Sequence, residues 1–196
     1  MKNKILLGTS NAGKIKEIRF YLEHFNIFQT FETLTPSDFK NLGAPIEDGI
    51  TFQDNAKLKS NFFYKATNIL SLSDDSGLIV DKLDGYPGIK TARVAKDLGG
   101  EQKVIDYIFS KFKNEAHLKA TFHCSIALIG NDKKLICSGR VKGSIISTNR
   151  GNSGFGYDPF FIPENNSKTF AEMEIQEKMI MSHRFNAFKV LANQIL

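Results

Sequence analysis

The residues with the clearest chemical potential lie near the start of the chain, where an apolar run at residues 5–7 leads into small and polar residues and then a lysine. A turn between a strand and a helix presents backbone N–H groups, and the helix dipole adds partial positive charge, so an anion is favoured there. We therefore expect a phosphate to bind the turn formed by Thr9, Ser10, Asn11, Ala12, Gly13 and Lys14.

The same stretch has the spacing of a P-loop, in which Gly8 is followed by four residues and then by Gly13 and Lys14. It departs from that motif at Ile15, where a P-loop carries the serine or threonine that holds Mg²⁺. An isoleucine cannot ligate a metal, which argues against a P-loop ATPase or kinase. That class remains an alternative, and its product would be inorganic phosphate or a phosphorylated acceptor.

Two adjacent carboxylates, Asp74 and Asp75, follow an apolar run at residues 69–72, at the predicted C-terminal end of a strand. Sheets of α/β proteins bind ligands at that edge. Both carboxylates stay charged only if a cation or hydrogen-bond donors offset their repulsion. We interpret them as a candidate Mg²⁺ site with a water-activating base, and an ordinary turn is the alternative. Further carboxylates that could contribute are Glu47, Asp48 and Asp54.

A predicted helix over residues 51–68 carries two polar residues on a face that is otherwise apolar. Thr51 is the expected N-cap, and Asn55 and Lys59 lie one helical turn apart. Lys59 either extends past the core into solvent or faces an anion-filled cleft, where its ammonium would contact phosphate. The sequence leaves both readings open.

A glycine-rich loop could receive a flat ligand, because glycine lets the backbone approach a planar group closely. Phe155 lies between two glycines and offers a stacking face, although packing of these aromatic residues in the core is the alternative. The loop residues that we expect to contact a substrate are Phe155, Gly156, Tyr157 and Asp158.

Three potential donors lie close together before and within the predicted C-terminal helix. They are Lys178, His183 and Arg184, with Ser182 as the expected N-cap. Such donors suit an electronegative group, for example the carbonyl of a purine.

Composition narrows the class of protein. Hydrophobic residues make up 41% and charged residues 24% of the 196 residues, which predicts one globular domain with a substantial core. The formal charge of +5 suits an anionic substrate, but the lysines are scattered, so we expect no stable nucleic-acid partner. An RNA-binding module is the second alternative, and it leaves the carboxylate pair unexplained, because carboxylates repel phosphate unless a metal intervenes.

The location of the protein follows from similar arguments. No apolar run reaches the ~18 residues of a membrane span, so no membrane partner is expected. Cys124 and Cys137, without a secretory signal, indicate free thiols in a reducing cytoplasm.

Hydrophobic periodicity and turn residues predict an α/β protein with a mixed sheet. The expected strands cover residues 3–8, 28–34, 69–73, 78–80, 118–129, 134–146 and 159–162, with a hairpin around Gly130, Asn131 and Asp132. The expected helices cover residues 14–25, 51–68, two segments within 89–112, and the C-terminal segment.

Taken in order, these segments closely resemble the non-canonical purine nucleoside triphosphate pyrophosphatases, the inosine/xanthosine triphosphate pyrophosphatase family. The resemblance spans nearly the full chain. Its motifs are the phosphate turn at residues 9–14, the Thr-Phe-Gln-Asp-Asn-Ala helix start at 51–56 with Lys59, residues 74–78, residues 87–93, the loop at 154–159, and Lys178 with residues 182–184.

The resemblance implies one domain over residues 1–196, with a mixed elongated sheet flanked by helices and two lobes around a central active-site cleft. It implies a homodimer that hydrolyses ITP, dITP and XTP to monophosphate and pyrophosphate, with Mg²⁺ as cofactor. Asp75 matches the catalytic base, and Glu47 resembles the acidic metal ligand of the family. Together with the carboxylate pair, the expected metal ligands are Glu47, Asp74 and Asp75. The implied substrate contacts are the phosphate turn, Asn55, Lys59, Ser76, residues 155–158, Lys178, His183 and Arg184. Asp54 replaces a glutamate of the family pattern and is one methylene shorter.

Overall fold

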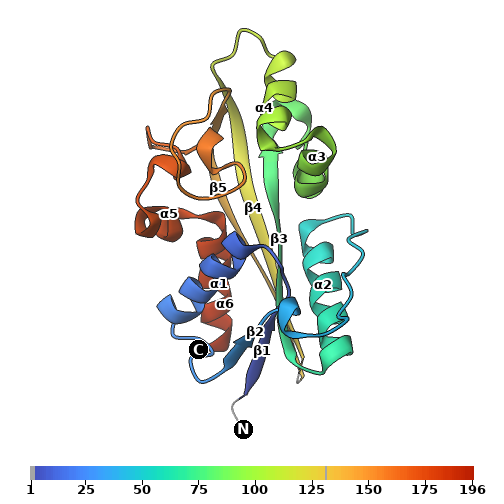
Figure 1. Cartoon of the computed structure of the whole chain (residues 1–196). Coiled ribbons are helices and arrows are strands. Elements are labelled where there is room, and N and C mark those ends of the chain that lie inside the picture. The colour runs from blue at the N-terminus through green and yellow to red at the C-terminus, as the bar shows by residue number, and fades with distance from the viewer. Residues whose placement is uncertain (1–2, 131) are drawn as a thin grey trace. The chain divides into compact units, whose positions relative to one another are not determined.

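A six-stranded sheet with the strand order β2-β1-β3-β4-β5-β6 is the framework of the computed structural model, which describes residues 3–130 and 132–196 (Figure 1). The strands are β1 (Lys4–Leu7), β2 (Glu32–Leu34), β3 (Leu70–Val80), β4 (His117–Gly130), β5 (Lys133–Ile146) and β6 (Phe161–Pro163). The helices are α1 (Ala12–His24), α2 (Phe52–Thr67), α3 (Thr91–Leu98), α4 (Glu101–Ser110), α5 (Ile175–Met181) and α6 (His183–Ile195). The predicted mixed α/β class is confirmed.

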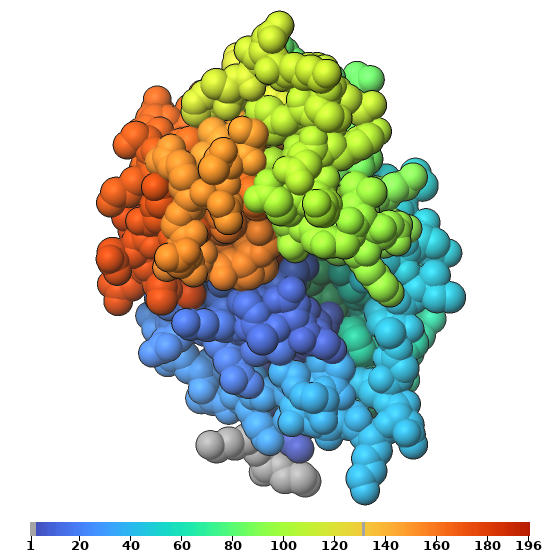
Figure 2. All heavy atoms as spheres, turned by 45° about the horizontal axis from the view of Figure 1, so that its top comes forward, coloured from blue at the N-terminus to red at the C-terminus, as the bar shows by residue number. Residues whose placement is uncertain are grey.

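The chain divides into two compact units. The first contains the described parts of residues 1–75, 124–139 and 184–196, and the second contains residues 76–123 and 140–183. In the space-filling view, the N-terminal part of the first unit is blue to cyan, and residues 76–123 of the second unit run from green to yellow (Figure 2). Strands β3, β4 and β5 contribute residues to both units.

Strand β1 is the apolar centre of the first unit. It pairs in parallel with β2 and β3, and Ile5, Leu6 and Leu7 are completely buried. Helix α2 lies over one face of this part of the sheet, and α1 and α6 lie over the other (Figure 1). A strand covered on both faces reads as a continuous apolar run, which is why this segment was predictable.

Gly8 follows β1 at a point where a side chain has no room. A Cβ built there would lie 2.1 Å from the Ser73 hydroxyl oxygen and 2.5 Å from the Phe63 ring. Glycine therefore allows the chain to leave the sheet and enter the turn that precedes α1.

Strand β3 differs from the prediction. Two short strands separated by a turn at residues 74–77 were expected, but β3 runs without interruption from Leu70 to Val80. It lies between β1 and β4 in the sheet, but β1 pairs only with residues 70–72. At residues 74–77 the neighbouring strand is β4, and pairing with it overrides the turn preference of Asp, Ser and Gly. Successive side chains of a strand point to opposite faces, and Asp74 and Asp75 are therefore separated by the sheet.

Most of the other expected elements are present. Thr51 caps α2 by accepting the Asp54 N–H at 3.1 Å, and Asn68 ends the helix in the left-handed conformation, with φ 54°. Strands β4 and β5 are adjacent in the sheet, as a hairpin requires, although Asn131 of the expected turn lies outside the described residues. The strand expected at residues 28–34 is reduced to β2, because Phe28 adopts a positive φ of 57° that interrupts extended backbone.

The second unit has its own core, in which aromatic side chains predominate on one side. Phe161 packs against Phe122 at 4.4 Å and against Phe170 at 5.3 Å between ring centroids. Buried aliphatic residues of β3 and α4 extend this cluster, among them Leu78, Val80, Val104, Ile105 and Ile108. The chain has no tryptophan, so phenylalanine supplies most of the aromatic part of this core.

His123 is a buried polar residue of the second unit. Its Nδ1 accepts a hydrogen bond from Arg140 Nε at 2.9 Å, so this nitrogen carries no proton. Burial, together with the positive charge of Arg140, lowers the pKa of His123 from 6.5 to about 4. The ring is therefore neutral in the folded protein at pH values at which it would be protonated in the unfolded chain.

We predict that the free energy of unfolding falls by about 2–3 kcal/mol through His123 as the pH decreases from about 6.5 to about 4. The unfolded chain binds a proton in this range and the folded protein does not, so acid favours unfolding. Urea denaturation across this range should show a smaller pH slope for His123→Gln, which keeps an acceptor for Arg140 but does not titrate. The matched control is His24→Gln at an exposed position. Equal slopes for wild type and His123→Gln would contradict the prediction.

Candidate active site

The turn between β1 and α1 is held by its own side chains. Asn11 is the N-cap of α1 and accepts the Lys14 N–H at 3.0 Å through its side-chain oxygen. The Asn11 N–H in turn donates to Thr9 Oγ1 at 3.2 Å. Residues 10–12 are exposed, and the first turn of α1 contains no acidic residue that would offset the positive end of the helix. This turn therefore has the electrostatics of an anion site.

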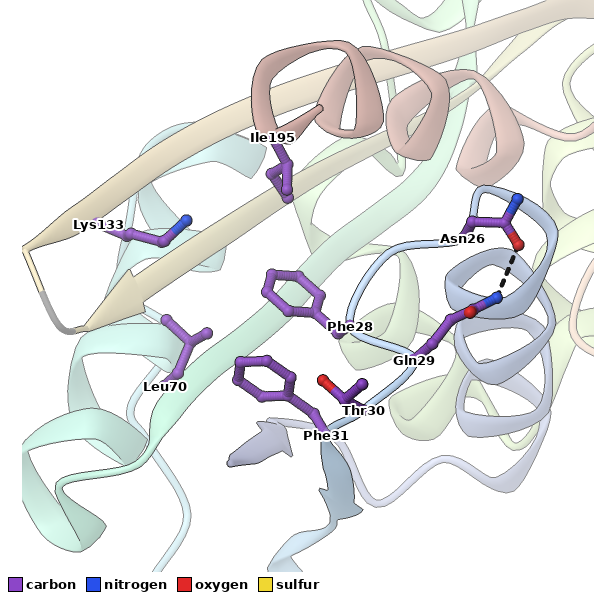
Figure 3. Close-up of a pocket in the computed structure, with 8 residues that line it drawn as sticks. All are labelled: Asn26, Phe28, Gln29, Thr30, Phe31, Leu70, Lys133 and Ile195. Atoms are coloured by element: carbon purple, nitrogen blue, oxygen red, sulfur yellow. Dashed lines mark hydrogen bonds between the residues drawn. The ribbon is translucent and has the colours of Figure 1, made fainter. Parts of the chain in front are cut away.

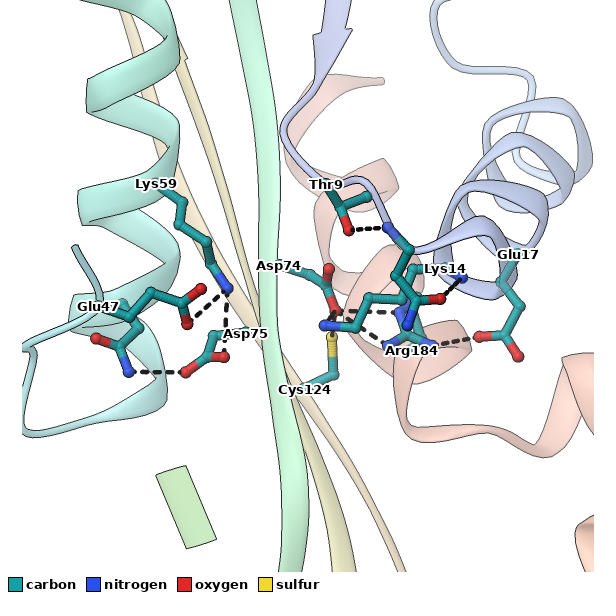
Figure 4. A network of polar contacts seen from close by, with 11 residues as sticks. Thr9, Lys14, Glu17, Glu47, Lys59, Asp74, Asp75, Cys124 and Arg184 are labelled. Carbon is teal, nitrogen blue, oxygen red and sulfur yellow. Dashed lines mark hydrogen bonds and ion pairs between the residues drawn. The ribbon is translucent and has the colours of Figure 1, made fainter. Parts of the chain in front are cut away.

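On the α1 side of β3, the Asp74 carboxylate is the centre of a buried ion-pair cluster (Figure 4). Asp74 Oδ2 lies 3.1 Å from Lys14 Nζ and accepts from Arg184 Nη2 at 3.0 Å. Arg184 also forms an ion pair with Glu17 of α1. The cluster thus joins β3, α1 and the start of α6 through two cations and two carboxylates.

The charges of this cluster hold one another ionised. Burial alone would raise the pKa of Asp74, but Lys14 and Arg184 keep it well below its ordinary value. Burial likewise opposes the charge of Arg184, yet Asp74 and Glu17 raise its pKa well above the usual value. Glu17 was missed by sequence reasoning, although an acidic residue beside the apolar positions of a helix is a usable signal for a buried ion pair.

Arg184 contacts two buried carboxylates in this structure. The sequence suggested a donor for a purine carbonyl, but the side chain is 1% exposed and its guanidinium donates to the carboxylates of Asp74 and Glu17. Asp74 Oδ1 is buried and has no hydrogen-bond partner among the described residues. The structure therefore uses Arg184 to fix Asp74.

On the α2 side of β3, Asp75 lies in a second polar cluster (Figure 4). Asn55 Nδ2 donates to Asp75 Oδ2 at 3.0 Å. Lys59 Nζ lies 3.4 Å from Asp75 Oδ1 and 3.2 Å from Glu47 Oε2, so its ammonium bridges two carboxylates. Lys59 is 8% exposed, and it does not extend into solvent.

Burial and pairing act in opposite directions on this second cluster. Burial raises the pKa of Asp75 and outweighs the opposing effects of Lys59 and the Asn55 hydrogen bond. Burial alone would lower the pKa of Lys59, but the carboxylates of Asp75, Asp74 and Glu47 raise it. A carboxylate with a raised pKa is a better proton acceptor than an ordinary aspartate, as a general base needs to be.

The arrangement of carboxylates bears on the expected metal site. Glu47 and Asp75 share Lys59, whereas Asp74 points to the opposite face of β3 and is engaged by Lys14 and Arg184. No group of three or more Asp, Glu, His or Cys side chains among the described residues is arranged to hold a metal. The carboxylates of Glu47 and Asp75 fit Mg²⁺ when substrate phosphates and water complete its coordination.

The expected contacts of the glycine-rich loop form a cluster within the second unit. Asp158 Oδ2 accepts the Phe155 N–H at 2.8 Å and pairs with Lys178 Nζ at 2.7 Å. Lys178 Nζ also lies 4.8 Å from the centroid of the Phe155 ring. Tyr157, by contrast, is 5% exposed and belongs to the hydrophobic core, so its ring is not placed for stacking on a ligand.

The remaining residues expected at the site also lie in the second unit. His183 is 7% exposed and stacks on Phe122, with 4.8 Å between ring centroids and an interplanar angle of 19°. Ser76 is half-buried on β3. The structure thus gathers the phosphate turn, Asn55, Lys59 and both aspartates in the first unit, and Phe155, Asp158, Lys178 and His183 in the second.

A pocket of about 460 Å³ in the first unit contains none of these residues (Figure 3). Phe28 and Phe31 form an edge-to-face pair in it, with 5.0 Å between ring centroids. Its complete lining is Asn26, Phe28, Gln29, Thr30, Phe31, Leu70, Lys133 and Ile195. A largely apolar hollow without carboxylates offers no chemistry of the kind found around Asp74 and Asp75.

We predict that Asp74→Asn lowers the free energy of unfolding by about 3–5 kcal/mol, because it removes the buried carboxylate that Lys14 and Arg184 share and leaves Arg184 with Glu17 alone. Urea denaturation measures the change. The matched control is Glu32→Gln, which breaks the half-exposed Lys4–Glu32 pair at 3.7 Å and should change stability by less than about 1 kcal/mol. If the two variants lost similar stability, the buried ion pairs of Asp74 would contribute no more to the free energy of unfolding than an exposed ion pair.

Comparison with known proteins places the chain in a family. The sequence profile of the Ham1 family matches residues 5–194. The dITP/XTP pyrophosphatase of Bacillus anthracis is 36% identical over 197 residues, covering 98% of this chain and 96% of the relative. That of Vibrio parahaemolyticus is 37% identical over 198 residues, covering 98% and 96%.

Solved structures agree with this assignment. The Staphylococcus aureus Ham1 protein superimposes with a TM-score of 0.84 at 32% identity, and a Ham1 protein from Coxiella burnetii superimposes with a TM-score of 0.86 at 31% identity. Each comparison covers 98% of both chains. The resemblance inferred from the motifs is confirmed, and the chain belongs to the Ham1 family.

Proposed function

We propose that this protein is a nucleoside triphosphate pyrophosphatase that hydrolyses dITP, ITP and XTP to the nucleoside monophosphate and pyrophosphate, and so removes them from the nucleotide pool. The observation that carries the proposal is the cluster in which Lys59 bridges the Asp75 and Glu47 carboxylates. Asp75 lies on strand β3, and the adjacent residue on that strand, Asp74, pairs with Lys14. Relatives named dITP/XTP pyrophosphatase, similar over nearly the full length, support the substrate class.

The phosphate chain would bind at the start of α1. Exposed backbone N–H groups and the positive end of the helix favour the anion there, and Lys14 can move from Asp74 to a phosphate oxygen. Lys59 would contact the same chain from the α2 side of β3. Both ammonium groups then neutralise charge that accumulates as the phosphoanhydride breaks.

Glu47 and Asp75 would hold Mg²⁺ together with oxygens of the triphosphate, because carboxylate and phosphate oxygens are the ligands that this ion prefers. When bound, the ion supplies positive charge that polarises the phosphoryl oxygen and offsets repulsion between the carboxylates. Asp74 is not part of this proposed set, since it lies on the other face of the strand and is paired with Lys14 and Arg184.

Asp75 would act as the general base. Its carboxylate orients a water molecule and accepts a proton from it, while the water oxygen forms a bond to the α-phosphorus. The bond between the α-phosphorus and the bridging oxygen breaks, and pyrophosphate leaves with the electron pair. Asn55 keeps the Asp75 carboxylate in place through the whole step.

We propose that the cluster of the second unit, around Phe155 and Lys178, selects the purine of the substrate. Hypoxanthine and xanthine carry a C6 carbonyl that accepts hydrogen bonds, where adenine carries an amino donor. Lys178 and His183 are donors, and Phe155 offers an aromatic face. A donor facing the adenine amino group would be left unpaired, at a cost of about 1–3 kcal/mol.

The proposal also covers the oligomeric state and the cellular location of the protein. We propose a homodimer because of the family resemblance, and a location in the cytoplasm because Cys124 and Cys137 are free thiols. Among the described residues, no helix is long and apolar enough to cross a membrane.

We predict that the purified protein with Mg²⁺ converts dITP to dIMP and pyrophosphate, with ITP and XTP as further substrates and ATP as a poor one. Phosphorus NMR or an assay coupled to inorganic pyrophosphatase identifies the product, and EDTA should abolish the reaction. Release of inorganic phosphate with a diphosphate product would instead favour the P-loop alternative.

We predict that Asp75→Asn lowers kcat for dITP by at least about 10²-fold with little change in KM, because the amide keeps the shape but cannot accept the proton. Steady-state kinetics at saturating Mg²⁺ provides both constants. Glu32→Gln removes an exposed carboxylate of the same unit and should retain wild-type kinetics. Retention of more than about a tenth of kcat by Asp75→Asn would exclude the base role.

A further inference from the structure

Asn55 occupies an unusual position between two segments that carry acidic residues. It lies in the first turn of α2 and is completely buried. Its Nδ2 donates to Asp75 Oδ2 at 3.0 Å, and its Oδ1 accepts the Gly49 N–H at 2.9 Å. Gly49 is two residues beyond Glu47, so a single carboxamide connects the chain near Glu47 to Asp75.

The direction of the carboxamide is fixed by its partners. The Gly49 nitrogen can only donate, so it must face Oδ1, which leaves Nδ2 to face the carboxylate of Asp75. Reversing the amide would oppose donor to donor on one side and acceptor to acceptor on the other. Asn55 therefore connects these two groups in one orientation only.

The loop before α2 depends on this contact. Residues 42–49 form no helix, strand or turn, and Ile46 and Ile50 are 80% and 86% exposed, so these two apolar side chains do not anchor it. Gly49 approaches so closely that a Cβ there would lie 2.7 Å from Asn55 Oδ1 and 2.9 Å from the Asn55 nitrogen. Glycine at this position allows the backbone to reach the carboxamide.

We propose that Asn55 is a positioning residue that fixes the spacing between Glu47 and Asp75, rather than the substrate contact expected from the sequence. This inference rests on the proposed function, because it assigns those two carboxylates to one metal and water site. Lys59 Nζ also contacts both carboxylates, but as a mobile ammonium it would be available to the phosphate chain. Asn55 then keeps the spacing between the Glu47 and Asp75 carboxylates when Lys59 moves to the phosphate chain.

Two substitutions separate the two hydrogen bonds. Asn55→Asp keeps an acceptor for the Gly49 N–H but loses the donor to Asp75, whereas Asn55→Ala loses both. Asn61 lies six residues further along α2 and is half-buried, so Asn61→Asp and Asn61→Ala reproduce the same chemical changes as controls. Thermal unfolding of each variant first establishes that it is folded.

Three measurements then test the inference on the full chain. We expect Asn55→Ala to increase the hydrogen-exchange rate of the Gly49 amide at least tenfold, and Asn55→Asp to leave that amide protected. We expect Mn²⁺, followed by electron paramagnetic resonance as a probe for the metal site, to bind Asn55→Ala about 10–100-fold more weakly. At saturating metal, kcat for dITP should fall about 10–100-fold in both variants, with KM within about threefold of wild type.

The possible results separate the positioning role of Asn55 from the proposed hydrolysis of dITP. A rise in KM with unchanged kcat would make Asn55 a substrate contact, and unchanged Gly49 exchange in Asn55→Ala would remove the proposed connection. Effects of equal size in the Asn61 variants would show a general helix effect and also overturn it. If wild type fails to hydrolyse dITP while Asn55→Ala still frees Gly49 and weakens Mn²⁺ binding, the proposed function fails and the positioning role stands. Should Asn55→Ala not fold, Asn55→Asp decides alone through retained Gly49 protection with reduced kcat.

Discussion

The alternation of side chains along β3 is the constraint on which the first unit depends. Asp74 and Asp75 are adjacent in sequence and both buried, yet they point to opposite faces of the sheet. Each face must therefore provide its own compensation for a buried negative charge, since an unpaired charge in the interior is strongly unfavourable. The helices that cover the two faces supply that compensation with different residues.

The two solutions differ in chemical character. Asp74 is surrounded by Lys14 and Arg184, its pKa is lowered, and it stays ionised as a structural anchor. Asp75 receives a single shared ammonium and one amide, its pKa is raised, and it retains affinity for a proton. One strand thus carries one carboxylate suited to holding cations in place and one suited to acid–base chemistry. The difference arises from the neighbours rather than from the side chains themselves.

The sequence predicted the elements that depend on local chemistry. The apolar run at β1, the Thr51 cap and the end of α2 near Asn68 follow from short-range rules, and the structure confirms them. The uninterrupted β3 was not predictable in this way, because pairing with β4, which is distant in the chain, decides it and the local turn preference does not. The contacts of Arg184 were not predictable from the local sequence either, because its partners Glu17 and Asp74 are 167 and 110 residues away in the chain.

The contact between Lys14 and Asp74 has a consequence for affinity and turnover. Asp74 is a tethered anion, and a tethered group competes with free ligands as if it were present at a high effective concentration. Any anion that takes Lys14 has to displace it, so a single orthophosphate gains little while a polyphosphate with several contacts gains more. In the proposed mechanism, Asp74 would return to Lys14 once the anhydride has been cleaved, which would favour departure of the products. In the proposed mechanism, the Asp74 carboxylate would therefore limit product inhibition.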